Sequence, residues 1–306
     1  MTGKIVILGI FVADTTYRAD RAPKTGETLI GTGFALGPGG KGSNQAVAAA
    51  RAGGEVHFIT RLGRDAFAEM ALAIWDKAGV IPEVTQHEDS FTGAACIFVE
   101  EATGDNAIIV CPGVAGTISA EDLDAQCDLV SGAAVFMTQL EQPMAAAVRG
   151  LELARAGGAV TILNPAPAAA LPEGMLALCD YVTPNESEAE MLTGLPVTNA
   201  EEAVSAAEAL LAKGVGAAII TLGEKGVLFH DGTTPLHLQA FDAGPVRETT
   251  GAGDAFNGGF AAALARGEAP VDAVRFGCAT AAISVTRAGA AASMPELSEI
   301  EALLAR

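Results

Sequence analysis

Basic residues are scarce in this chain of 306 residues: 18 lysines and arginines stand against 37 aspartates and glutamates, which gives a formal net charge of −19. An acidic surface repels phosphate backbones and anionic lipid, so we expect no nucleic-acid partner and no membrane partner. No apolar run approaches the roughly 18 residues that would span a bilayer. A polyanionic ligand must therefore be held locally, by backbone amides, a few cations or metal ions.

Cysteine and histidine are also sparse. The five cysteines form neither a C-x-x-C pair nor a disulfide-framework spacing, which favours a reducing compartment. The four histidines lie too far apart for a zinc motif. The apolar stretch from Ile5 to Ala13 is broken by Gly9 and stopped by Asp14, with no signal-peptide cleavage pattern after it. We therefore expect a cytoplasmic protein.

Apolar runs of strand length alternate with longer Ala- and Leu-rich segments of helical period. This order predicts an α/β fold, a mostly parallel central sheet with helices on both faces. Strands are expected at 4–9, 56–60, 134–138, 160–163, 181–183 and 217–221. Helices are expected at 43–52, 66–78, 144–156, 186–192, 200–213, 254–265 and 270–286.

Two β-rich stretches, at about 12–36 and 92–111, interrupt the alternation. The second contains two strand-like segments joined by a turn at 103–106. An insertion beside the end of the first strand is placed to cover the crevice where open α/β sheets bind ligands. An ordinary extension of the sheet edge is the alternative.

A glycine-rich turn leads into the helical pattern at Ser43, which we expect to be the N-cap. Residues 37–42 match G-x-G-x-x-G, but they lie more than twenty residues after the first strand, which argues against a dinucleotide site and so against a dehydrogenase. Lys41 is followed by glycine rather than Ser or Thr, which excludes a P-loop. The turn instead lets backbone groups, Lys41 and Asn44 approach a small hydroxylated ligand.

A second glycine turn precedes Asp254, at the start of another helical pattern. Three successive amides, those of Gly251, Ala252 and Gly253, would form an anion hole at a helix N-terminus. Such amides can stabilise a transferring phosphoryl group while the Asp254 carboxylate accepts a proton from an attacking hydroxyl. A purely capping role for Asp254 is the alternative.

Two weaker patterns accompany these turns. Asn185 and Glu188 stand one helical turn apart, a spacing that suits hydrated Mg²⁺ but is, on its own, more often a helix start with a solvated acidic face. Residues 219–227 form a strand that enters a glycine-flanked turn. This turn is either a nucleotide contact or a plain strand-turn-strand connection.

Five segments, taken together and in order, resemble the ribokinase branch of the PfkB carbohydrate-kinase family: GGKGSNQAVAAARAG, LNPAPA, TPNESEAEMLTG, ITLGEKG and TTGAGDAFNGGF. The resemblance runs from Ile5 to Pro295. It implies one ribokinase-like α/β domain over 1–306, with the two β-rich stretches as a discontinuous lid. It also implies ATP-dependent phosphorylation of a sugar's primary hydroxyl, with D-ribose expected to give ribose 5-phosphate. Another pentose, fructose or a nucleoside is the alternative substrate, and a non-catalytic sugar or nucleotide sensor the alternative class.

The resemblance also assigns roles by position. Asp254 matches the base, and Gly251, Ala252 and Gly253 match the anion hole. The sugar-binding positions match Asp14, Gly40, Lys41, Asn44, Glu141 and Asp254. The ATP-binding positions match Asn185, Thr221, Leu222, Gly223, Glu224, Lys225, Gly226, Gly253 and Cys278. Mg²⁺ would be organised by Asn185 and Glu188, and an activating K⁺ by Glu248, Thr250, Ser284, Arg287, Gly289 and Ser293, several of them through backbone carbonyls.

Three positions depart from the family pattern. Val12 replaces an asparagine usual in ribose-specific members, Glu248 replaces an aspartate beside the K⁺ site, and Cys278 replaces a histidine or asparagine near the adenine. These departures bear on sugar choice, K⁺ dependence and base selectivity. The resemblance further implies a homodimer through the lid, consistent with apolar lid residues such as Ile97, Phe98 and Val99.

Overall fold

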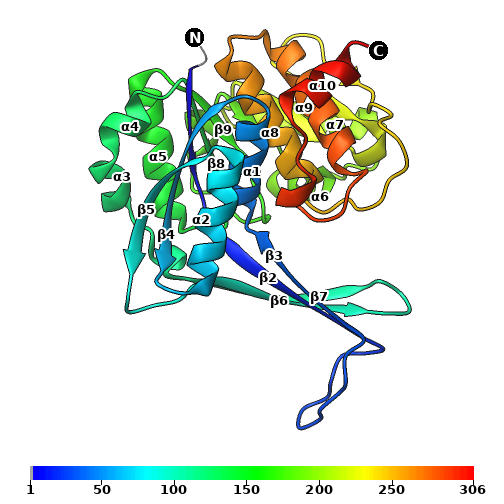
Figure 1. The fold of residues 1–306 in the computed structure, drawn as a ribbon. Coiled ribbons are helices and arrows are strands. Elements are labelled where there is room, and N and C mark those ends of the chain that lie inside the picture. Colours follow the sequence, from blue (N-terminus) through cyan, green and yellow to red (C-terminus); the bar gives the residue numbers. More distant parts are fainter. Residues whose placement is uncertain (1–2) are drawn as a thin grey trace.

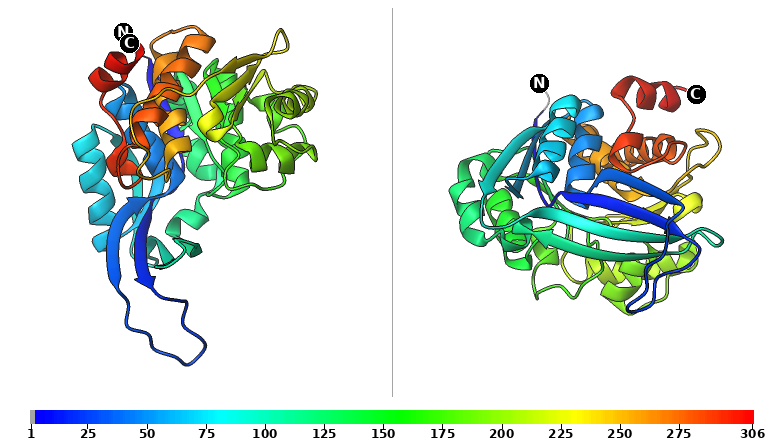
Figure 2. Two further views of the ribbon diagram at one scale, coloured as in Figure 1. Left: turned by 90° about the vertical axis from the view of Figure 1, so that its right-hand side faces the viewer. Right: turned by 60° about the horizontal axis from the view of Figure 1, so that its bottom comes forward.

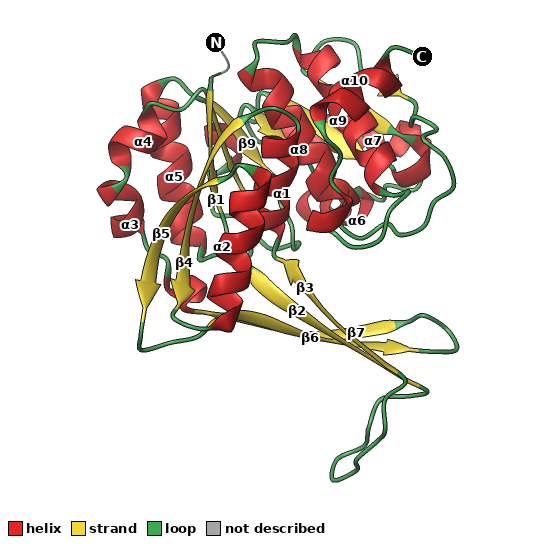
Figure 3. Cartoon of the chain, viewed as in Figure 1, coloured by secondary structure: helices red, strands yellow, loops and turns green. Residues whose placement is uncertain are grey.

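The computed structural model describes residues 3–306 and contains a nine-stranded sheet, a four-stranded sheet and the helices that cover the larger one (Figures 1 and 3). The large sheet has the order β13-β12-β11-β10-β9-β8-β1-β4-β5, parallel from β5 to β11 and antiparallel at β12 and β13. Its strands are β1 (Lys4–Leu8), β4 (Glu55–Gly63), β5 (Ile81–His87), β8 (Val135–Thr138), β9 (Val160–Leu163), β10 (Tyr181–Val182), β11 (Ala217–Thr221), β12 (Val227–His230) and β13 (Leu236–Leu238).

Alternate side chains of the parallel strands enter two separate cores. Ile5 and Ile7 of β1 pack under one helical layer, while Val6 and Leu8 pack under the other. Strands buried on both faces need apolar residues at every position, which explains the continuous runs in the sequence. The first layer contains α1 (Lys41–Arg51), α2 (Ala66–Ala78), α8 (Ala252–Ala265), α9 (Pro270–Ser284) and α10 (Leu297–Leu304); the second contains α3 (Ala120–Ala125), α4 (Cys127–Ser131), α5 (Met144–Gly157), α6 (Glu186–Thr193) and α7 (Ala200–Leu211).

The small sheet extends from one end of the α/β body, together with the long loop at 20–32 (Figure 2). Its order is β3-β2-β6-β7, built from β2 (Val12–Ala19), β3 (Gly33–Gly39), β6 (Thr92–Glu100) and β7 (Asn106–Gly113). The two β-rich stretches expected from the sequence thus form one sheet. Of the apolar residues expected on its surface, Ile97 packs against the second core.

The expected strands and helices of the large sheet are all present within a few residues of their predicted ends. The expected N-cap was wrong: α1 begins at Lys41 after Gly40, whose φ of 87° needs glycine, and the buried Ser43 hydroxyl accepts a hydrogen bond from Trp75 Nε1 at 2.9 Å. The sequence patterns also missed β5, β13, α3, α4 and α10, which are short or largely exposed elements, and indicated β12 only as the second strand of the strand-turn-strand alternative at 219–227.

Helices α1 and α8 approach each other closely at Gly258. A Cβ atom placed there would lie 2.4 Å from Ala48 Cβ and 2.8 Å from the Gln45 carbonyl oxygen. This contact sets the distance between two helices whose first turns carry the candidate site. Between residues 3 and 306, no helix combines the length and the apolar character needed to cross a bilayer.

Candidate active site

Asp254 lies in the first turn of α8, which begins after Gly251 in the left-handed conformation (φ 78°). The helix has no side-chain cap, so Asp254 is not the capping residue. Its carboxylate is instead clamped by α1: Asn44 Nδ2 donates to Oδ2 and Gln45 Nε2 to Oδ1, both at 3.0 Å. Burial raises the pKa of Asp254, while Lys41 and these two donors act in the opposite direction.

The N-terminus of α8 opens onto free space. A Cβ atom at Gly253 would meet nothing within 4 Å. The amide of Ala252 donates to the Thr249 carbonyl at 3.1 Å, whereas the Gly251 and Gly253 amides have no backbone acceptor among residues 3–306. The anion hole expected from three amides therefore has two available amides and one that is already engaged.

Two further carboxylates lie near Asp254. Asp14 projects from β2 above Gly39, and burial raises its pKa to about 6. Glu141 follows β8; burial raises its pKa to about 7, although the Lys41 amide donates to it at 2.7 Å. Neighbouring buried carboxylates with a raised pKa are typical of functional sites.

The turn at Gly40 and Lys41 joins the small sheet to α1 and so carries the expected sugar residues to the same place. A side chain at Gly40 would collide with the Ile10 carbonyl at 2.5 Å. Asn44 is only 5% exposed, and its Oδ1 atom has no hydrogen-bond partner in the described chain. A buried acceptor without a partner is costly unless a ligand supplies the donor.

Asn185 and Glu188 form a capping box at the start of α6. The Glu188 amide donates to Asn185 Oδ1, and the Asn185 amide donates to Glu188 Oε2, both at 2.9 Å. Glu188 is 8% exposed, and burial raises its pKa while Lys41 opposes that shift. The expected helix start is therefore confirmed, but its expected solvation was wrong at Glu188, whose carboxylate is buried close to Lys41 and Asp254.

The expected ATP turn lies beside Asn185, which forms an isolated β-bridge with Thr221. Residues 223–225 make a single 3-10 turn, and Gly226 (φ 94°) contacts the segment after β13, where a Cβ atom would lie 2.0 Å from the Leu238 carbonyl. The Leu222 side chain belongs to the second core, so only its backbone faces the turn. Lys225 Nζ donates to the Thr198 carbonyl at 3.1 Å.

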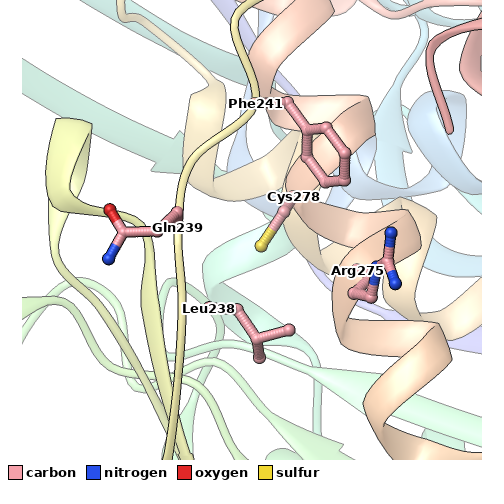
Figure 4. A pocket seen from close by; sticks show the side chains of 5 residues that line it. All are labelled: Leu238, Gln239, Phe241, Arg275 and Cys278. Atoms are coloured by element: carbon pink, nitrogen blue, oxygen red, sulfur yellow. The ribbon is translucent and has the colours of Figure 1, made fainter. Parts of the chain in front are cut away.

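A cavity of about 260 Å³ continues from this segment toward α9 (Figure 4). Cys278 lies at its back, with Arg275 one helical turn earlier on α9. Burial raises the pKa of the Cys278 thiol to about 12, so it behaves as an apolar wall. The lining residues are Leu238, Gln239, Phe241, Arg275 and Cys278.

The residues expected around K⁺ lie in two segments that meet. The Gly289 amide donates to Glu248 Oε2 at 2.9 Å, which joins the loop before α8 to the loop after α9. Ser284 and Ser293 are buried and donate to carbonyls of their own segments, whereas Arg287 pairs with Glu299 on α10. In the part of the chain that is described, no three histidine, cysteine or acidic side chains cluster as metal ligands.

The sequence patterns gave no role to Gln45, Gln139 or Asn164. Each is a buried amide within the hydrogen-bond network around Asp254. The signal available was weak: Gln45 follows Asn44, and Asn164 follows a buried strand in the LNPAPA segment. Leu238, Gln239, Phe241 and Arg275 were missed because a strand end and a helix face are brought together only by the fold.

The chain is similar over nearly its whole length to known proteins. The model of the pfkB family carbohydrate kinases matches residues 2–297. A protein of Staphylococcus aureus named ribokinase is 37% identical over 303 residues, which cover 98% of this chain and 99% of that protein. A deoxyribokinase of Salmonella typhi is 34% identical, with 98% of each chain covered. The solved structure of Arabidopsis thaliana ribokinase complexed with ribose and ATP has a TM-score of 0.95 at 30% identity and covers 99% of both chains. The chain belongs to the pfkB family of carbohydrate kinases.

Proposed function

We propose that the chain transfers the γ-phosphoryl group of ATP to the primary hydroxyl of D-ribose and so makes ribose 5-phosphate. The observation that carries this proposal is Asp254, a buried carboxylate held by two amide donors at an open helix N-terminus. Full-length similarity to proteins named ribokinase also supports the proposed reaction.

Asp254 would act as the general base. Each of its oxygens accepts one hydrogen bond from α1, which leaves lone pairs for the sugar hydroxyl. The hydroxyl oxygen would form a bond to the γ-phosphorus while the bond from that phosphorus to the β,γ-bridging oxygen breaks and ADP leaves. The hydroxyl proton would pass to the Asp254 carboxylate. The amides of Gly251 and Gly253, and the dipole of α8, would stabilise the charge on the transferring group.

Asp14 and Glu141 would hold the sugar by accepting hydrogen bonds from neighbouring hydroxyls. The Asn44 Oδ1 atom, buried and without a partner in the described chain, would accept another. A site built from such acceptors discriminates strongly against analogues that lack the matching hydroxyl. Lys41 would offset the negative charge of these carboxylates and of the phosphates.

The nucleotide would lie along Asn185, the 221–226 turn and the Cys278 cavity, with the adenine in the cavity. A single carboxylate, Glu188, fits a Mg²⁺ ion that keeps most of its water shell and is bound mainly through phosphate oxygens. When bound, Mg²⁺ would neutralise charge on the β- and γ-phosphates. Asn185 and Glu188 would orient the water molecules of that ion.

A monovalent cation such as K⁺ would bind between Glu248 and the loop at 284–293. The hydrogen bond from Gly289 to Glu248 already holds these segments together, and carbonyl oxygens of Thr250, Ser284, Arg287, Gly289 and Ser293 are the proposed ligands. An ion at this position would fix the backbone before α8 and thereby the anion hole. The chain would act in the cytoplasm, where its cysteines stay reduced.

The small sheet would serve as a lid and as the contact between two copies of the chain. Strand register places Tyr17, Phe34, Leu36 and Ile109 on one face, and Ile109 is 68% exposed. Exposed apolar area of this kind is typical of an interface. Light scattering after size exclusion should give the dimer mass at micromolar concentration, and a monomer mass would contradict the proposal.

2-Deoxyribose is a second candidate substrate, because Val12 lies on the same face of β2 as Asp14 and offers no hydrogen bond. The similarity to a protein named deoxyribokinase supports including it. A sugar that lacks the hydroxyl facing Val12 would lose no hydrogen bond there and so no binding free energy from one.

A coupled ADP-release assay with ATP, Mg²⁺ and K⁺ tests the proposal across ribose, 2-deoxyribose, other pentoses, fructose and nucleosides. Ribose should give the highest kcat/KM. A higher kcat/KM for 2-deoxyribose would identify it as the substrate instead. A higher kcat/KM for fructose or a nucleoside would reject both ribose and 2-deoxyribose. Sugar binding by calorimetry without any ADP release would indicate a sensor instead of an enzyme.

A further inference from the structure

We propose that Gln45 and Asn164 are positioning residues for phosphoryl transfer, because together they dictate which hydrogen-bonding group faces Asp254. The inference rests on the proposed role of Asp254 as the base. Neither residue would touch substrate; both would act through the orientation and charge of that carboxylate.

The orientation of each amide follows from one fixed point, the backbone carbonyl of Thr183. A carbonyl can only accept, so the Asn164 side chain must turn its NH₂ group toward it, and the two lie 3.0 Å apart. Asn164 Oδ1 then faces Gln45 as an acceptor, at 3.1 Å from Nε2. The Gln45 NH₂ group therefore faces Asn164, and its second N–H donates to Asp254 Oδ1, with Nε2 and Oδ1 3.0 Å apart.

The other end of the Gln45 amide is held as well. Its Oε1 atom accepts a hydrogen bond from Gln139 Nε2. Gln45 and Gln139 are fully buried, and Asn164 is 7% exposed, so water has little access to compete for these groups. A flipped Gln45 would place two oxygens against each other at both Asp254 and Asn164, which the low local dielectric makes costly.

Asn44 and Gln45, the two side chains that donate hydrogen bonds to Asp254, are both neutral amides. The charged groups that face it come from four other positions: Lys41 of α1, Glu141 after β8, Glu188 of α6 and, beyond Glu141, Asp14 of β2. Three of these four are acidic, and Lys41 together with the two amide donors favours the ionised form of Asp254. Without the Gln45 donor, the pKa of Asp254 rises further above its ordinary value.

The variants Gln45→Leu and Asn164→Leu test the inference, with ribose as substrate. Gln45→Leu should lower kcat about 10- to 100-fold, the effect of losing one hydrogen bond to a charged group, with little change in KM. The pH at which kcat reaches half its maximum should move upward by about one unit. Asn164→Leu should give a smaller loss in the same direction, since it only frees the Gln45 amide to turn.

Gln142→Leu is the matched control. Gln142 is also a buried amide, but it donates to Thr138 Oγ1 and the Gln139 carbonyl and has no contact with Asp254. It should reduce the thermal unfolding midpoint as much as Gln45→Leu does while leaving the pH midpoint of kcat in place. An equal pH shift in this variant would overturn the inference.

A double-mutant cycle with Asp254→Asn separates this inference from the proposed base. If Asp254→Asn retained normal turnover, the base assignment would be wrong whatever the other variants do. If Asp254→Asn is nearly inactive but Gln45→Leu keeps the wild-type kcat and pH midpoint, the positioning role is refuted while the base stands. The expected result is that Gln45→Leu costs nothing further in the Asp254→Asn background. Should Gln45→Leu not fold, Asn164→Leu decides by the same criteria.

Discussion

The close approach of α1 and α8 makes Gly258→Ala a sensitive test of the site. The added Cβ would lie 2.4 Å from Ala48 Cβ, whereas ordinary contacts begin at 3.4 Å, so the helices must separate by about 1 Å. The hydrogen bonds from Asn44 and Gln45 to Asp254, now 3.0 Å, would lengthen to about 4 Å and be lost.

Two measurable effects follow. A displacement of about 1 Å at a reacting group can cost on the order of 100-fold in rate, and we expect a loss of kcat of that size. Overpacking should also lower the free energy of unfolding by about 1–3 kcal/mol. Steady-state kinetics with ribose and ATP gives the first quantity, and urea unfolding followed by circular dichroism gives the second.

Gly150→Ala is the control for overpacking alone. A Cβ atom at Gly150 of α5 would lie 2.4 Å from Phe136 Cζ, the same overlap, but in the core on the opposite face of the sheet. It should destabilise the protein without changing kcat of the folded fraction. Equal kcat values for the two variants would refute the argument that helix spacing sets the geometry at Asp254.

The titration of the sugar carboxylates should have opposite effects on binding and stability. Burial raises the pKa of Glu141 to about 7 and of Asp14 to about 6. KM for ribose should therefore rise as pH falls from 7 to 6, since protonated carboxyls lose acceptors. The folded protein holds these protons more tightly than the unfolded chain. The contribution of both groups to the free energy of unfolding should therefore be full near pH 4 and fall as pH rises to about 7. A Glu141→Gln variant should flatten the pH dependence of both KM and the free energy of unfolding. Replacement of Glu248 by alanine should reduce activation by KCl, measured against equal concentrations of choline chloride, and unchanged activation would place the cation elsewhere. The variant Cys278→Phe should fill much of the 260 Å³ cavity and raise KM for ATP about tenfold or more while leaving KM for ribose unchanged; equal effects on both would contradict the assignment of the adenine site.

Much of the large sheet could be predicted from the sequence, because its central strands are buried on both faces. Segments such as Lys4–Leu8 and Ala217–Thr221 must be apolar throughout, and the helices between them carry a clear 3.6-residue period. The elements that escaped prediction lack this constraint. β5 contains a proline and is largely exposed, and β13 has three residues with little burial.

The start of α1 shows why local signals mislead at a functional turn. Serine is a good N-cap, yet the helix begins two residues before Ser43 because Gly40 must pass close to the Ile10 carbonyl. The Ser43 hydroxyl instead accepts a hydrogen bond from Trp75 Nε1. This partner is 32 positions away in sequence, so no local pattern could have identified it.

Local patterns identified site residues at the glycine-rich turns and at the start of the helix after Asn185, while Asp14 and Glu141 were assigned only by the family resemblance. The network behind Asp254 has no such mark, because Gln45, Gln139 and Asn164 are single amides separated by as many as 119 positions. Their meeting depends on topology. The carboxyl ends of β8, β9 and β10 lie side by side in the sheet, and Gln139, Asn164 and Thr183 each follow one of them directly.

This arrangement also explains why an acidic cluster is tolerated in the fold. Asp14, Glu141, Glu188 and Asp254 all have a raised pKa from burial, so each is held at a cost when ionised. Only one cation, Lys41, is common to the last three of these groups. Hydroxyl donors from a sugar and cations accompanying a nucleotide would satisfy the same carboxylates, so binding would relieve a destabilisation that the free protein carries. The scaffold makes this possible, since α6, α8, strand β2 and the segment after β8 hold these carboxylates in position before any ligand arrives.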